Sequence, residues 1–143
     1  MVKRNKWRIK EAVKIAEEAG LKALRTGAEA ILTEAIDETP IDTGTLRRSG
    51  TVTVGKLPDS ARIYEAAEAG NEMKDAFPEP VGKEKAVYIS FNTPYARRQH
   101  EELDYEHPRG GKAKYLETPF NANKNKVIKY AERKIKEALK REP

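Results

Sequence analysis

The chain of 143 residues has no cysteine, and it has no apolar run long enough to cross a lipid bilayer. Without cysteine there is no disulfide framework, and neither a thiolate nucleophile nor a thiolate metal ligand is available. The basic N-terminus is not followed by an apolar signal core, which argues against a secretory signal peptide. We therefore expect no membrane partner and a protein that stays in the cytoplasm or in a particle assembled there.

Apolar residues are also scarce, at 38% of the chain, whereas charged residues reach 36%. This length fits a single domain spanning residues 1–143, with a core of modest size. A thin core under a highly charged surface is typical of proteins that gain stability by associating with copies of themselves or with a partner.

The net charge of +5 is unevenly distributed along the chain. Residues 1–25 and residues 121–143 each carry eight Lys or Arg and three Glu, whereas the middle of the chain has a net charge of −5. Basic ends and an acidic middle indicate either nucleic-acid contact through the ends or complementary packing between copies. Solvated lysine faces on two helices would give the same pattern.

Residues 7–38 are predicted to form one long helix that ends before Pro40. Its apolar face recurs at steps of three and four residues: Ile9, Val13, Ala16, Gly20, Leu24, Ala28, Ile31 and Ala35. Gly20 and Gly27 each cost helix stability, about 1 kcal/mol relative to Ala. We expect both to permit close approach of another element, although a break at Gly20 is the alternative.

The rest of the chain predicts short strands and a second long helix. Strands are expected at 51–54, at 61–64 and, most clearly, at 86–91, with a long mobile insertion at 65–85 that has a short helical piece near 65–69. A short helix could start at 95–103, and Thr118 and Pro119 are expected to cap and open the last helix. The buried stripe predicted for that helix, with Phe120 anchoring its start, is Ile128, Ala131, Ile135 and Leu139. The predicted fold is α+β, a small antiparallel β-sheet packed with a long N-terminal helix and a C-terminal helix.

One polar cluster could bind a divalent metal: His100, Glu101, Glu102, Asp104, Glu106 and His107. Its spacing matches no metal motif, and no serine lies in a nucleophile-elbow context. No glycine-rich loop suits a phosphate, and no small-molecule substrate is indicated. The sequence therefore predicts no catalytic residues, no metal and no cofactor.

The run from Pro40 to Ser49 is the most informative part of the sequence. Pro40 fixes φ, Asp42 and Thr43 can bond to their own backbone, and Gly44 can adopt a positive φ. Leu46 then returns the chain to the core. Two arginines, at 47 and 48, place fixed positive charge beside this turn.

This turn, joined to the later run 93–101 and to 111–119, resembles the minor capsid and head–tail connector proteins of tailed bacteriophages, the neck or tail-completion type. The residues that carry the resemblance, or lie beside them as candidate interface residues, are Pro40, Asp42, Thr43, Gly44, Leu46, Arg47, Arg48, Tyr95, Ala96, Arg97, Arg98, His100 and Glu101. Ser49 also belongs to the pattern.

The resemblance implies a structural virion protein at the head–tail junction, assembled in the host cytoplasm. It implies assembly with itself, as a ring, and with other phage head, neck or tail proteins, near packaged DNA and without enzymatic activity. Two alternatives from other classes stay open. One is a metal-dependent nuclease or RNA-cleaving toxin that uses His100 and His107, and the other is a basic nucleic-acid-binding protein.

Overall fold

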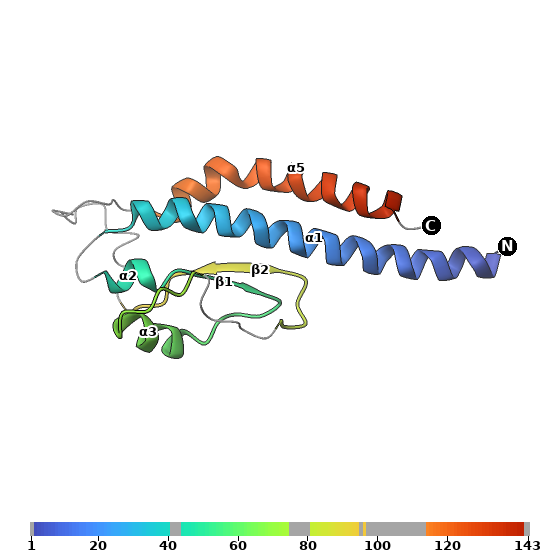
Figure 1. The fold of residues 1–143 in the computed structure, drawn as a ribbon. Coiled ribbons are helices and arrows are strands. Elements are labelled where there is room, and N and C mark those ends of the chain that lie inside the picture. Colours follow the sequence, from blue (N-terminus) through green and yellow to red (C-terminus); the bar gives the residue numbers. More distant parts are fainter. Residues whose placement is uncertain (1, 41–43, 75–80, 95, 97–113, 142–143) are drawn as a thin grey trace.

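The computed structural model describes residues 2–40, 44–74, 81–94, 96 and 114–141, with side chains from residue 8 onward. The elements follow in the order α1 (Val2–Glu38), α2 (Thr45–Arg48), β1 (Thr51–Val54), α3 (Ser60–Glu68), β2 (Val87–Ser90) and α5 (Glu117–Arg141). Helix α5 lies along one side of α1, and the sheet with α2 and α3 lies on the other (Figure 1). The predicted α+β class is confirmed.

Helices α1 and α5 pack side by side and antiparallel (Figure 1), and two glycines of α1 allow their close approach. A Cβ atom at Gly20 would lie 3.2 Å from the Cδ1 atom of Ile135, and one at Gly27 would lie 2.5 Å from a methyl carbon of Val127. The predicted role of these glycines in close approach is therefore confirmed. Helix α1 continues through Gly20 without a break.

Strands β1 and β2 pair antiparallel, from Thr51 opposite Ser90 to Val54 opposite Val87. Both were predicted, and they form the two-stranded sheet that packs against α1. Alternation is visible in β1, where Thr51 and Thr53 are buried and the two valines are half-buried.

The strand predicted at 61–64 is wrong, because these residues belong to α3. The Asp59 side chain accepts a hydrogen bond from the Arg62 backbone N–H at 3.3 Å, which caps the helix start. Ile63 and Ala67, four residues apart, are the buried residues of this helix.

The insertion predicted at 65–85 begins inside α3, which extends the short helical piece expected near 65–69. Met73 is buried against α3, and its backbone N–H donates to the Arg48 carbonyl at 2.8 Å. The Gly82 N–H donates to the Val54 carbonyl at 2.9 Å. Residues 75–80 lie outside the described part, and the mobility of the segment stays a prediction.

Helix α5 begins at Glu117, so Thr118 lies inside the helix and is not its cap. Its backbone N–H already donates to the Lys114 carbonyl at 3.0 Å. Ala131 is buried as predicted, but Ile128 and Leu139 of the predicted stripe are 50% and 39% exposed. Val127 packs against α1 in place of Ile128. The contact with Gly27 rotates the helix so that the stripe through Val127 faces α1.

Candidate assembly surface

At Gly44 the turn after α1 has the positive φ that its sequence predicts. Gly44 has a φ of 87°, and a Cβ atom there would lie 2.6 Å from the Nη1 atom of Arg48. Pro40 is buried just beyond the end of α1. Asp42 and Thr43 lie outside the described residues. A residue other than glycine at position 44 would therefore be strained in its backbone, and the Arg48 guanidinium would have to move to make room for it.

Arg47 and Arg48 use their guanidinium groups within the chain. Arg47 donates to the Thr39 carbonyl at 3.1 and 3.0 Å and to the Asp37 carbonyl at 3.1 Å. Arg48 donates through Nε to the Ala67 carbonyl at 2.8 Å. Asp37 and Ala67 lie in the last turns of α1 and α3, and Thr39 directly follows α1. The last carbonyls of a helix have no partner within the helix, although the Ala67 carbonyl also accepts from the Gly70 N–H at 3.0 Å. The two arginines thus complete the ends of two helices.

The three motif runs meet in one buried cluster. Leu46, Ala96 and Tyr115 pack together, and the Tyr115 hydroxyl donates to the Ala96 carbonyl at 2.8 Å. Phe91 packs against this cluster, with its ring edge-on to Tyr115 at 5.0 Å between centroids. Tyr95, Arg97, Arg98, His100 and Glu101 lie outside the described residues.

A second link joins the turn to the residues after β2. The Asn92 backbone N–H donates to the Ser49 hydroxyl at 3.0 Å, and the Asn92 side chain donates to the Ser49 carbonyl at 2.9 Å. Both residues are buried. Sequence reasoning did not select Asn92 or Tyr115 as site residues, because the contacts that give each its role come from distant parts of the chain.

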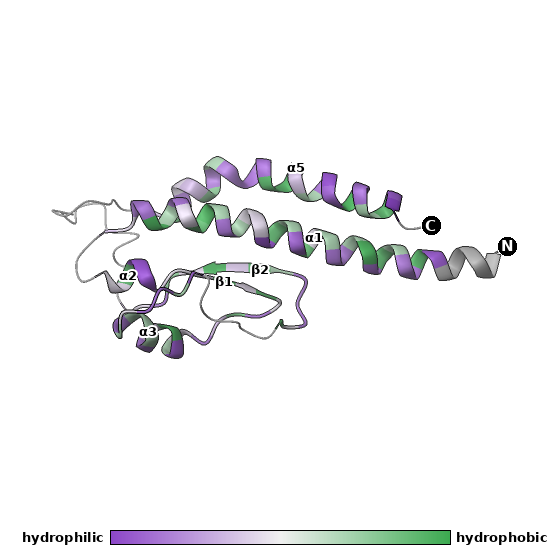
Figure 2. Ribbon diagram, viewed as in Figure 1, coloured by the Kyte–Doolittle hydropathy of each residue, from purple (hydrophilic) through white to green (hydrophobic). Residues whose placement is uncertain are grey.

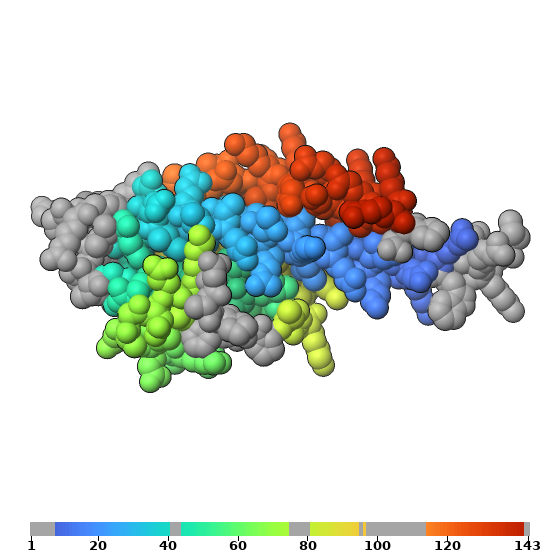
Figure 3. Space-filling view, viewed as in Figure 1, coloured from blue at the N-terminus to red at the C-terminus, as the bar shows by residue number. Residues whose placement is uncertain are grey.

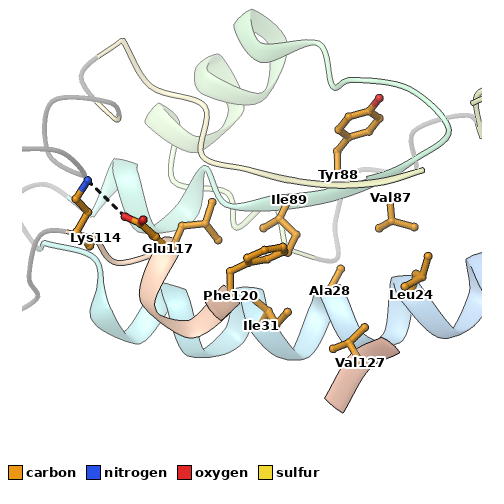
Figure 4. A pocket seen from close by; sticks show the side chains of 11 residues that line it. Leu24, Ala28, Ile31, Val87, Tyr88, Ile89, Lys114, Glu117, Phe120 and Val127 are labelled. Atoms are coloured by element: carbon orange, nitrogen blue, oxygen red, sulfur yellow. Dashed lines mark ion pairs between the residues drawn. The ribbon is translucent and has the colours of Figure 1, made fainter. Parts of the chain in front are cut away.

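Between α1, β2 and the start of α5 the molecule has an open, mostly apolar groove of about 690 Å³. Figure 4 shows Val87 and Ile89 pointing into it from β2, opposite Leu24, Ala28 and Ile31 of α1. We call it the apolar groove, and its lining residues are Leu24, Ala28, Ile31, Val87, Tyr88, Ile89, Lys114, Leu116, Glu117, Phe120 and Val127.

Charge near the groove is confined to a few side chains. At one end Lys114 and Glu117 form an ion pair at 3.4 Å (Figure 4). On the outer side of β2, the Tyr88 hydroxyl donates to the Glu84 carboxylate, and this hydrogen bond, with desolvation and the carboxylate charge, raises the pKa of Tyr88. The middle of the groove is therefore suited to apolar side chains.

A second apolar surface lies near the start of α1. This helix continues past the end of α5 (Figures 1 and 3), and Ile9 and Val13 remain 62% and 52% exposed there. They lie four residues apart, so both are on one face. Figure 2 shows apolar residues recurring along α1, whereas α5 is mostly polar. We call residues 8–13 the N-terminal overhang.

No cluster of three His, Cys, Asp or Glu side chains that could hold a metal ion occurs among the described residues. The polar cluster that contains His100 and His107 lies outside them. The described helices include none that is both long and apolar enough to cross a membrane.

The model of a protein family described as "Bacteriophage HK97-gp10, putative tail-component" matches residues 4–97, about two thirds of the chain. The matched part runs from α1 through the turn, both strands and α3 to Ala96. The chain belongs to this HK97-gp10-like family. The neck and tail-completion family predicted from the motifs is therefore confirmed.

Members of the HK97-gp10-like family are structural components of phage particles, so this chain is a bacteriophage structural protein of the tail or neck type. Helix α5 lies beyond the matched residues, yet it packs on glycines that lie inside them. No curated protein and no solved structure matches the chain.

Proposed function

We propose that this protein works at the head–tail junction as a neck, tail-completion or minor capsid protein, and that it acts by assembling into a ring. The role is mechanical and needs no catalytic step. It places the protein in the virion, in contact with other head, neck or tail proteins. Membership of the HK97-gp10-like family supports the structural role, and the two exposed apolar surfaces support the assembly mode.

The observation that carries the proposal is a pair of different apolar surfaces on one chain. The apolar groove is a concave surface between three elements, and the overhang presents Ile9 and Val13 on a protruding helix. We propose that the overhang of one copy enters the groove of the next. Contacts between two different surfaces are heterologous, and they generate a ring when the rotation between copies closes.

The charged motif residues are proposed as secondary contacts with a neighbouring subunit or connector protein. They are Arg47, Arg48, Arg97, Arg98, His100 and Glu101. The two arginines at 47 and 48 also hold helix ends inside the chain. Substituting them would therefore change stability as well as assembly, which makes them poor probes of the interface.

Val13→Asp is a sharper test, because Val13 is exposed and its loss should leave the fold intact. We expect self-association, measured by analytical ultracentrifugation alone and with portal-proximal phage proteins, to weaken on the order of tenfold or more, since burial of a valine is lost. Val81→Asp is the matched control, because Val81 is 69% exposed and does not line the groove.

Equal weakening by both variants would show that general charge matters and not the overhang. A wild-type chain that stays monomeric and ignores every neck, head and tail component would overturn the assembly role itself.

A further inference from the structure

The antiparallel pair of helices α1 and α5 places the two basic ends of the sequence side by side (Figure 1). Two adjoining hollows, of about 560 and 300 Å³, follow the seam between these helices and share Thr26 and Tyr130. We call them together the basic furrow. Its cations are Lys22, Lys126, Lys134 and Arg141.

Among the residues that the structure describes, most of these cations have no ion-pair partner. Lys22, Lys126 and Arg141 form no ion pair with any residue that the structure describes. Lys134 pairs with Glu137 at 3.3 Å and also lies 5.6 Å from the centre of the Tyr130 ring. The acidic side chain that lines the furrow is Glu34, at the end farthest from Arg141, where Asn123 donates to it at 2.8 Å.

The cations form a row along α5. Lys126, Lys134 and Arg141 are separated by eight and seven residues, so they lie on one face of the helix, over a length of about 22 Å. An evenly spaced row of cations suits a regularly repeating polyanion better than a single anion. Duplex DNA advances about 3.4 Å for each phosphate of one strand, so this length faces about six phosphates.

We propose that the basic furrow binds the phosphate backbone of duplex DNA, without reading its sequence. Lys22 and Thr26 lie about half a turn around α1 from Leu24 and Ala28. The smaller hollow of the furrow nevertheless shares Ile31 and Val127 with the apolar groove, so the two surfaces adjoin. The two proposals can still fail separately, because the four cations of the furrow do not line the groove and Val13 does not line the furrow.

The test is fluorescence anisotropy with a labelled duplex of 20 base pairs at several salt concentrations. Four phosphate contacts predict that log K falls with log salt at a slope of about −3.6. Removing Lys126 and Arg141 together, as Lys126→Ala with Arg141→Ala, should reduce this slope by about 1.8. Circular dichroism should show unchanged helix content, because both side chains are exposed.

The matched control is Lys129→Ala with Lys136→Ala, which removes the same charge from the same helix. These lysines do not line the furrow and are exposed. The control should keep the wild-type slope. An equal loss in both double variants, or no binding by the wild type at 50 mM salt, would overturn the proposal. Equal binding of poly-glutamate would also overturn it and assign the furrow to an acidic protein segment.

Discussion

Gly27 determines how closely α5 can lie on α1. The nearest atoms to a Cβ built there are the two methyl carbons of Val127, at 2.5 and 2.7 Å, and its Cβ atom at 3.1 Å. A β-branched side chain in a helix has one strongly preferred rotamer, so Val127 cannot turn away easily. At Gly20 the nearest atom is the flexible end of Ile135, at 3.2 Å. Two glycines seven residues apart on one face of α1 therefore differ in their tolerance of a side chain.

Gly27→Ala should lower the free energy of unfolding by about 1 kcal/mol. Overpacking costs typically 1–3 kcal/mol, and the better helix propensity of alanine returns about 1 kcal/mol. Gly20→Ala is the matched control and should be neutral or stabilising. Urea denaturation measures both variants. Adding Val127→Ala to Gly27→Ala relieves the overlap. The double variant should therefore lose less free energy of unfolding than the sum of the losses in the two single variants. Equal effects of the two single alanines would contradict this account of the seam.

Helix α1 is a single element with unequal surroundings along its length. Its middle and C-terminal part pack on α5 and the sheet, and Ala28, Ile31, Leu32 and Ala35 are buried. The N-terminal overhang has no such cover, as the exposure of Ile9 and Val13 shows. A helical segment without tertiary packing is marginal in water. Stability should therefore fall from the middle of α1 toward its start.

Hydrogen exchange should reveal this gradient in the free protein. Amides of residues 9–13 should exchange roughly a hundredfold or more faster than those of residues 28–35, because local opening is less costly there. The Met73 amide, which donates to the Arg48 carbonyl, should be protected and serves as an internal reference. In the assembled particle, residues 9–13 should gain protection. Slow exchange of the overhang in a verified monomer would contradict an exposed, unpartnered segment.

Periodicity predicted the long elements well because it extends over many turns. Helix α1 ends at Glu38 as predicted and begins at Val2, five residues before the predicted start. The four residues 61–64 are too few to separate a period of 2 from one of 3.6, and Asp59 then starts a helix in place of the predicted strand. The contact of Val127 with Gly27 was missed for a related reason, since a helical sequence shows its apolar residues but not its rotation against a partner.

At the scale of the whole molecule, the fold rearranges the charge pattern of the sequence. The two basic ends, far apart in the chain, become neighbours in the antiparallel pair of α1 and α5, and the acidic middle contains the sheet and α3. The apolar groove likewise combines Leu24, Ile89 and Phe120 from three separate elements. No local pattern could have indicated it. The turn motif was recognisable from sequence because its residues are consecutive, whereas its contacts with Asn92 and Tyr115 were not.

Opposite charges on one molecule should make its assembly sensitive to salt. We expect the dissociation constant of self-association to rise several-fold between 50 and 500 mM NaCl, because exposed charges are screened beyond about 8 Å at physiological ionic strength. Sedimentation equilibrium at the two concentrations measures it. Assembly that strengthens with salt would show that charge between copies opposes association, and that the apolar contact alone drives it.

The overhang and the floor of the groove belong to the same helix. From Val13 to Leu24 the chain advances eleven residues, which is about 16 Å along a rigid rod. In the proposed ring the length of this helical segment fixes how far each subunit is displaced from the next. Loops elsewhere in the chain could change in length without altering that displacement. The diameter of the ring would then be encoded in the rise of a single helix.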